Sequence, residues 1–209
     1  AHAFQGRPLV APVPATDLYL PELQAVRQSL DADIGERAAL GTWNVVFHPA
    51  AYRRDRWSTT KRLREAVEQV SVRLRSEIPS SRHLRVTDGR VESVSSVAAF
   101  GMTASGLVFA AVPYWEDTSD VAAPRWSTNP TLDSNFVRYK WLDFLNTVYS
   151  VTELLALLAR LAALYPAEDV SYRVTATALA GRRIVTTTSN VLWSPTEPCR
   201  SREFVRERT

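Results

Sequence analysis

Apolar residues recur at intervals of three and four in two stretches of the chain, which is the spacing of one face of an α-helix. The first predicted helix begins at Asp17 or Pro21 and ends near Gly41. The second follows the hydroxyl residues at 58–60, which are favourable N-caps. The apolar faces comprise Leu23, Val26, Leu30 and Ile34 in the first helix, and Leu63, Val67, Val70 and Leu74 in the second.

A longer helix is predicted for residues 141–165, which end immediately before Pro166. Its second half is apolar nearly all round. This pattern is typical of a central helix that is covered on most sides.

Strands are predicted where apolar residues run together or alternate. Residues 42–49, TWNVVFHP, form a short apolar run that suits a buried strand. Residues 84–115 contain turn signals at Asp88-Gly89 and in GMTASG, which predict a three-strand antiparallel meander. Residues 170–178 alternate between two faces, and RRIVTTT is expected to return beside them as a hairpin with Gly181 in its turn. These elements predict an α+β fold, in which two or three helices, including one long central helix, pack on a mainly antiparallel sheet.

The length and composition of the chain limit the number of domains it can form. Its 209 residues and 45% apolar content suit one packed domain. We divide the chain into an extended lead or linker at 1–16, a single α+β domain at 17–193 and a polar tail at 194–209. A long polar loop occupies residues 116–134, and loops of this length are often functional.

The expected location is the cytoplasm of a bacterium. The N-terminus lacks the pattern of a signal peptide, and we expect no apolar run to approach the length of a bilayer span. Only Lys61 and Lys140 are lysines among the 25 basic residues, a bias typical of GC-rich coding. Cys199 is the single cysteine, so an internal disulfide and a cysteine-based zinc site are excluded.

Common catalytic signatures are missing, and we expect neither a catalytic residue nor a cofactor. His2, His48 and His83 stand far apart and outside metal-binding motifs. Neither lysine follows a glycine as in a phosphate-binding loop. Neither has the acidic residue two positions earlier that many metal-dependent nucleases use.

Basic residues are concentrated at the start of the second predicted helix. Between residues 52 and 85, ten basic residues stand against four acidic ones. Arginines and the exposed amides of a helix start suit phosphate contacts, and an aromatic ring can stack on a base. The alternative is a solvated helix face whose arginines pair with Glu65 and Glu68. The candidate nucleic-acid or anion-binding residues, which we call the basic patch, are Arg53, Arg54, Arg56, Trp57, Lys61, Arg62 and Arg64.

Three carboxylates, Glu116, Asp117 and Asp120, lie close together at the start of the long polar loop. Hard divalent cations prefer oxygen ligands, so these residues form a candidate metal site. The alternative is that the three side chains are simply solvated.

Arg182 and Arg183 follow Gly181 at the expected hairpin turn. Alternation sends adjacent strand residues to opposite faces, so the two arginines do not readily hold one ligand. We interpret them as markers of the turn, with one arginine able to pair inward while the other is solvated.

Four short motifs in the C-terminal half resemble a region found downstream of the Schlafen-type AlbA_2 domain in bacterial proteins. They are Ser105-Gly106 before a strand, Glu116-Asp117, Thr152-Glu153 in a helix, and ALAGRR at 178–183. The carboxylate-rich AlbA_2 core itself is absent. The resemblance therefore implies an accessory region of a regulatory or defence protein, with no established active site to transfer.

We interpret the chain as a non-catalytic binding or scaffolding module of a nucleic-acid-related regulatory or defence protein. Its expected contacts are a partner protein, an upstream domain or nucleic acid, through the basic patch and the apolar sides of helix 141–165. The alternatives are an atypical metal-dependent hydrolase that uses the acidic loop, and a structural subunit that oligomerises through helix 141–165. No membrane contact is expected.

Overall fold

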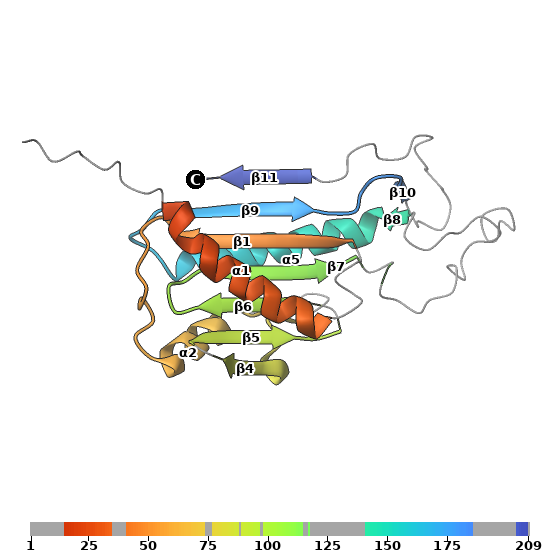
Figure 1. The fold of residues 1–209 in the computed structure, drawn as a ribbon. Coiled ribbons are helices and arrows are strands. Elements are labelled where there is room, and N and C mark those ends of the chain that lie inside the picture. Colours follow the sequence, from red (N-terminus) through yellow and green to blue (C-terminus); the bar gives the residue numbers. More distant parts are fainter. Residues whose placement is uncertain are drawn as a thin grey trace, which may run out of the picture.

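A seven-stranded antiparallel sheet forms the centre of the protein in the computed structural model (Figure 1). The structure describes residues 15–34, 41–73, 77–87, 89–96, 98–114, 117, 141–185 and 204–208. The sheet order is β11-β9-β1-β7-β6-β5-β4. The strands are β1 (Thr42–Pro49), β4 (Leu84–Thr87), β5 (Arg90–Val94), β6 (Ala99–Thr103), β7 (Val108–Pro113), β9 (Val170–Ala176) and β11 (Phe204–Arg208). The predicted α+β class with a mainly antiparallel sheet is confirmed.

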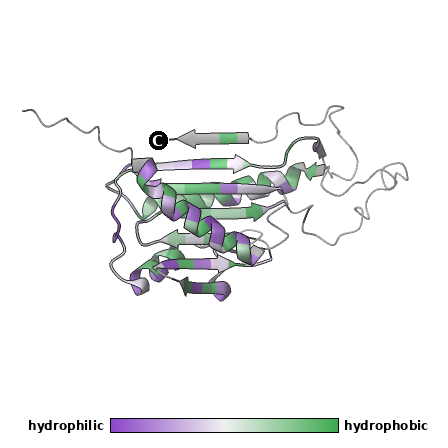
Figure 2. Ribbon diagram, in the orientation of Figure 1, coloured by the Kyte–Doolittle hydropathy of each residue, from purple (hydrophilic) through white to green (hydrophobic). Residues whose placement is uncertain are grey.

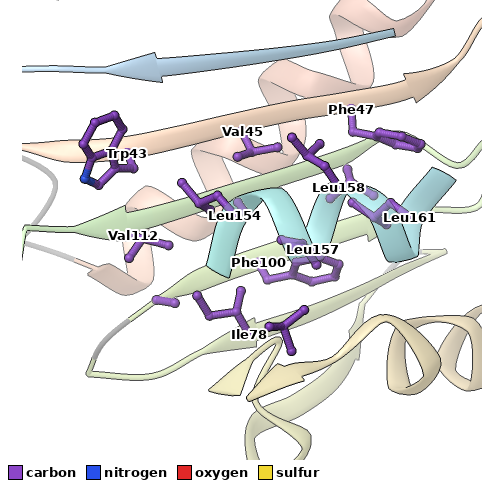
Figure 3. Packing of buried hydrophobic residues seen from close by; sticks show 14 of the residues in the cluster. Trp43, Val45, Phe47, Ile78, Phe100, Val112, Leu154, Leu157, Leu158 and Leu161 are labelled. Carbon is purple, nitrogen blue, oxygen red and sulfur yellow. The ribbon is translucent and has the colours of Figure 1, made fainter. Parts of the chain in front are cut away.

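Helices cover both faces of this sheet. On one face, α1 (Ala15–Ile34) places Val26 and Leu30 against Phe109 and its neighbours. On the other face lie α2 (Thr60–Val70) and α5 (Phe144–Ala163), as Figure 1 shows. Here the larger hydrophobic core forms, because α5 directs Leu154, Leu157, Leu158 and Leu161 toward Trp43, Val45, Phe47 and Phe100 (Figure 3).

The first two predicted helices are present, although their ends differ from the predicted ones. The side chain of Thr59 caps α2 by accepting a hydrogen bond from the Arg62 backbone N–H at 3.3 Å. This helix ends at Val70, and Leu74 lies outside the described residues. The first helix runs from Ala15 through Pro21 to Ile34, and it therefore ends before Gly41.

The predicted three-strand meander contains four strands, β4 to β7. The additional reversal lies between β5 and β6, where the Ser95 N–H donates to the Ala98 carbonyl at 2.9 Å. The Ser95 hydroxyl also bonds both backbone groups of Ala98. This serine-made turn has no glycine or proline at its tip, which is why the pattern did not reveal it.

The C-terminal strands pair differently from the expected hairpin. Strand β9 lies between β1 and β11. Strand β10 (Arg183–Val185) instead pairs in parallel with β8 (Trp141–Asp143), in a separate two-stranded sheet. Gly181 does adopt a positive φ of 80°, as expected for the turn, but the chain leaves the main sheet there. Residues 204–208, which carry no clear pattern and fall in the expected tail, form β11 at the sheet edge.

Two minor elements complete the described fold. Strands β2 (Val72–Arg73) and β3 (Glu77–Ile78) form a second two-stranded sheet after α2. A short 3₁₀ helix, η2 (Ser81–His83), then leads into β4.

Candidate functional site

Five members of the basic patch, those other than Arg56 and Trp57, are exposed around the N-terminal end of α2. Three of them pair with carboxylates: Lys61 with Glu65, Arg64 with Glu68, and Arg53 with Glu168 at 3.9 Å. Arg54 and Arg62 have no ion pair within the part of the chain that the structure describes. The accessible positive charge of the patch is therefore smaller than its residue count indicates.

Arg56 is an internal residue, because only 9% of its side chain is exposed. Its guanidinium donates to Glu168 Oε1 at 2.6 Å and to the carbonyls of Ser105 at 3.2 Å and Ala51 at 2.5 Å. It also lies over the Tyr165 ring, 5.3 Å from the centroid. Arg56 thus joins three loops at one end of the sheet and is not available to a ligand.

Burial and charge pairing at this end of the sheet shift the pKa values of several ionisable groups. Burial alone would lower the pKa of Arg56, but the hydrogen bond and charge of Glu168 raise it above its ordinary value. In return, the hydrogen bond from Arg56 lowers the pKa of Glu168. Burial raises the pKa of Tyr165 to about 12. The ion pair therefore remains charged over the whole physiological range.

Trp57 also faces inward. It is half-buried, packs against the main core and meets Tyr165 edge-on at 6.3 Å between ring centroids. Its buried indole Nε1 makes no hydrogen bond of full geometry within the described residues, although the Trp57 side chain lies close enough to Tyr165 to oppose part of the rise in the pKa of that tyrosine. Part of the ring is therefore used in packing, and stacking of Trp57 on a base stays a prediction.

Of the acidic candidates, Asp117 is described and is only 1% exposed. Both of its carboxylate oxygens accept hydrogen bonds from Arg182, at 2.9 and 2.5 Å. Asp117 Oδ2 also accepts from the Gly41 N–H at 3.3 Å. Glu116 and Asp120 lie outside the described residues, and no group of three His, Cys, Asp or Glu side chains within the described ranges is arranged to hold a metal ion.

Arg182 is the inward-pairing arginine of the doubled pair. Its guanidinium lies 4.7 Å from the centroid of the Tyr114 ring, and its Nε donates to the Ala178 carbonyl at 2.7 Å. Arg183 begins β10, and its side chain lies outside the described part of the chain. The Arg182–Asp117 pair brings together two of the four motifs in the resemblance, and it does so as a structural contact.

A carboxylate that the sequence did not single out is Glu22 on α1. Its Oε2 accepts hydrogen bonds from Thr103 at 2.8 Å and from Ser105 at 2.5 Å. Its Oε1 accepts from Tyr52 at 2.8 Å, which raises the pKa of that tyrosine. These contacts fasten α1 to the turn between β6 and β7, and Ser105 is only 1% exposed, so the cluster has a structural role.

The outward side of α5 is an apolar surface. Five large side chains on this helix are between 41% and 55% exposed: Phe144, Leu145, Val148, Tyr149 and Leu155. Exposed Thr152, Ala159 and Ala163 complete what we call the α5 outer face. In Figure 2, α5 is coloured mainly as hydrophobic, whereas α1 on the opposite face carries many hydrophilic residues. The expectation that this helix is covered on most sides holds only for its inner side.

By length and composition alone, α5 could cross a membrane, contrary to the expectation from sequence. Core helices of soluble proteins meet the same criteria. Here the inner leucines of α5 pack on the sheet, and 28% of its most apolar stretch is buried.

No protein-family model, no curated protein and no solved structure matches this chain.

Proposed function

We propose that the chain is a non-catalytic binding module whose partner is a protein, and that the partner docks on the α5 outer face. The observation that carries this proposal is the exposure of five large apolar side chains along one helix. Continuous exposed apolar surface on a folded protein is typical of interaction sites.

The fold itself does not require apolar residues on this side. Leu154, Leu157 and Leu161, each no more than 1% exposed, already fix α5 to the sheet. Polar residues of good helix propensity would serve equally well at the exposed positions and would improve solubility. A protein partner supplies the physical reason for keeping these positions apolar.

The wider setting that we propose is a bacterial cytoplasmic protein of a regulatory or defence system, in which this chain is an accessory region. Support for this setting comes from the sequence resemblance and from the arginine-rich composition. The exposed apolar residues of α5 support the choice of contact surface, and they do not bear on the wider setting.

Site-specific photo-crosslinking tests the proposal. A photoreactive phenylalanine analogue replaces Leu155 on the α5 outer face, and a matched variant carries it at Leu20, which is 50% exposed on α1. We expect covalent adducts from position 155 in native cells and few from position 20. Equal yields at both positions, or no adduct from position 155, would contradict the proposal.

Nucleic-acid binding is the second candidate, because Arg54 and Arg62 are exposed and unpaired within the described residues. Fluorescence anisotropy with labelled DNA and RNA at two salt concentrations measures it. Each phosphate contact that these two arginines make should contribute about −0.9 to the slope of log K against log salt for duplex DNA. Binding that disappears in an Arg54→Glu/Arg62→Glu variant supports this candidate, and the absence of binding at low salt rejects it.

A further inference from the structure

Resting on the proposed contact surface, we infer that the partner is a second copy of this chain. Two α5 helices pack antiparallel about a twofold axis through the middle of the helix. An interface of this kind uses the same surface on both subunits, so that surface must be complementary to itself.

The α5 outer face meets this condition in its spacing. A stripe of exposed positions runs along it at intervals of four, four, three, four and four residues. Because this series reads the same in both directions, antiparallel pairing superimposes the stripe on its own copy. The stripe consists of Phe144, Val148, Thr152, Leu155, Ala159 and Ala163.

The sizes of the side chains are also complementary. The N-terminal half of the stripe carries Phe144 and Val148, whereas the C-terminal half carries Ala159 and Ala163. In the antiparallel pair Phe144 and Val148 each face an alanine of the other copy. Leu155 faces Thr152. The alanines let the helices approach to about 8–10 Å between axes, the usual range for packed helices. Parallel pairing would place Phe144 on Phe144 and alanine on alanine, which packs poorly.

Charge favours a second copy over a charged peptide. The stripe carries no charged side chain, and the guanidinium of flanking Arg160 is bonded to the Ser71 carbonyl of its own chain. Two copies therefore bring no like charges together on the stripe, and antiparallel helix dipoles attract weakly. A charged ligand would find no counter-charge on the stripe itself.

The area of the contact determines the expected affinity of the dimer. A helix of 20 residues is about 30 Å long, so a single helix pair lies at the small end of specific interfaces. We therefore expect a reversible dimer with a dissociation constant in the roughly micromolar range.

Cysteine cross-linking under mild oxidation tests the geometry in the full chain with Cys199→Ser. The double variant Val148→Cys/Ala159→Cys places a cysteine of each copy opposite one of the other, within the reach of a disulfide. In the single variant Val148→Cys, the two sulfurs are separated by about 16 Å along the helices. We expect a covalent dimer from the double variant and little from the single one. No dimer from the double variant, or equal dimer from both, would overturn the inference.

Sedimentation velocity of the unmodified chain provides the second measurement. The wild type should shift from monomer to dimer with rising concentration, and Val148→Glu should remain monomeric with unchanged circular dichroism. A wild type that is monomeric at all concentrations overturns the second copy as the partner. Adducts to a different protein from position 155 would, in that case, leave the proposed binding function standing, whereas their absence would remove both.

Discussion

At the scale of single residues, Arg182 and Asp117 connect three segments that are distant in the sequence. Their side chains are 3% and 0% exposed, and they join the turn after β9 to the end of β7 and the start of β1. Gly41 is required at this point, because a Cβ there would lie 2.8 Å from the Arg182 guanidinium and still closer to the Tyr114 ring. Removing either partner would break this buried bidentate ion pair.

We expect Arg182→Ala to lower the free energy of unfolding by about 3–5 kcal/mol. Arg182→Lys should rescue only part of this loss, because lysine cannot form the bidentate contact with Asp117. Exposed Arg62→Ala is the control and should change stability by less than about 0.5 kcal/mol. Urea unfolding measures all three variants, and a loss below about 1 kcal/mol for Arg182→Ala would show that the pair contributes little.

Tyr19 and Tyr165 make the stability of the protein sensitive to alkali. Burial raises the pKa of each to about 12, from an ordinary value of 10.0. A folded-state pKa above the unfolded one means that stability is complete below pH 10 and decreases as the pH rises toward 12.

Tyr165→Phe should remove part of this alkaline decrease. Below pH 10 it should cost little, because within the described residues the buried Tyr165 hydroxyl makes no hydrogen bond of full geometry and interacts only weakly with the Trp57 side chain. Urea midpoints recorded at pH 8, 10 and 11 give the comparison. Parallel profiles for the wild type and the variant would contradict the assignment to Tyr165.

At the scale of elements, α5 has two apolar sides with different roles. Leu157 is fully buried against the sheet, whereas Leu155, two positions earlier, is 55% exposed. Both residues are leucines, so the same substitution at the two positions separates the effect of core packing on stability from the effect of changing an exposed side chain.

We expect Leu157→Ala to destabilise the protein by about 2–5 kcal/mol and Leu155→Ala by less than about 0.5 kcal/mol at concentrations where the chain is monomeric. Thermal unfolding of both variants is the measurement. A large loss in Leu155→Ala would show that the α5 outer face belongs to the core of the monomer.

Elements with a clean local pattern could be predicted from the sequence, and so could the antiparallel pairing of successive strands in the meander, whereas pairing between distant strands could not. Strand β1 was predicted at its observed bounds, and Thr59 was among the three predicted caps of α2. The partner of β10 and the strand β11 depend on tertiary contacts of short segments, which leave no periodic signal.

The candidate site shows the same limit. Arg56 looked like a ligand-binding residue because its partner Glu168 is 112 positions away. Asp117 looked like a metal ligand because Arg182 is 65 positions away. The apolar pattern of helix 141–165 is evident in the sequence. A pattern alone does not show whether an apolar side of the helix is buried within its own chain or is open to a second chain.

At the scale of the whole molecule, the helices on the two faces of the sheet differ in what they present to solvent. Helix α1 fastens its polar side chains to the sheet through Glu22 and Ser29. On the opposite face, α5 offers an uncharged apolar stripe, and the exposed cations of the basic patch lie at the start of neighbouring α2. This layout supports a module that binds through one face.

The most direct test of the account is the solvent accessibility of leucine methyl groups in solution. With methyl-labelled leucine and a soluble nitroxide, NMR reports separately on exposed Leu145 and Leu155 and on buried Leu154 and Leu157. We predict that Leu145 and Leu155 are broadened by the nitroxide at low protein concentration and become protected at high concentration, whereas Val148→Glu keeps them broadened throughout. Broadening of Leu145 and Leu155 that is independent of concentration in the wild type would contradict self-association through the α5 outer face.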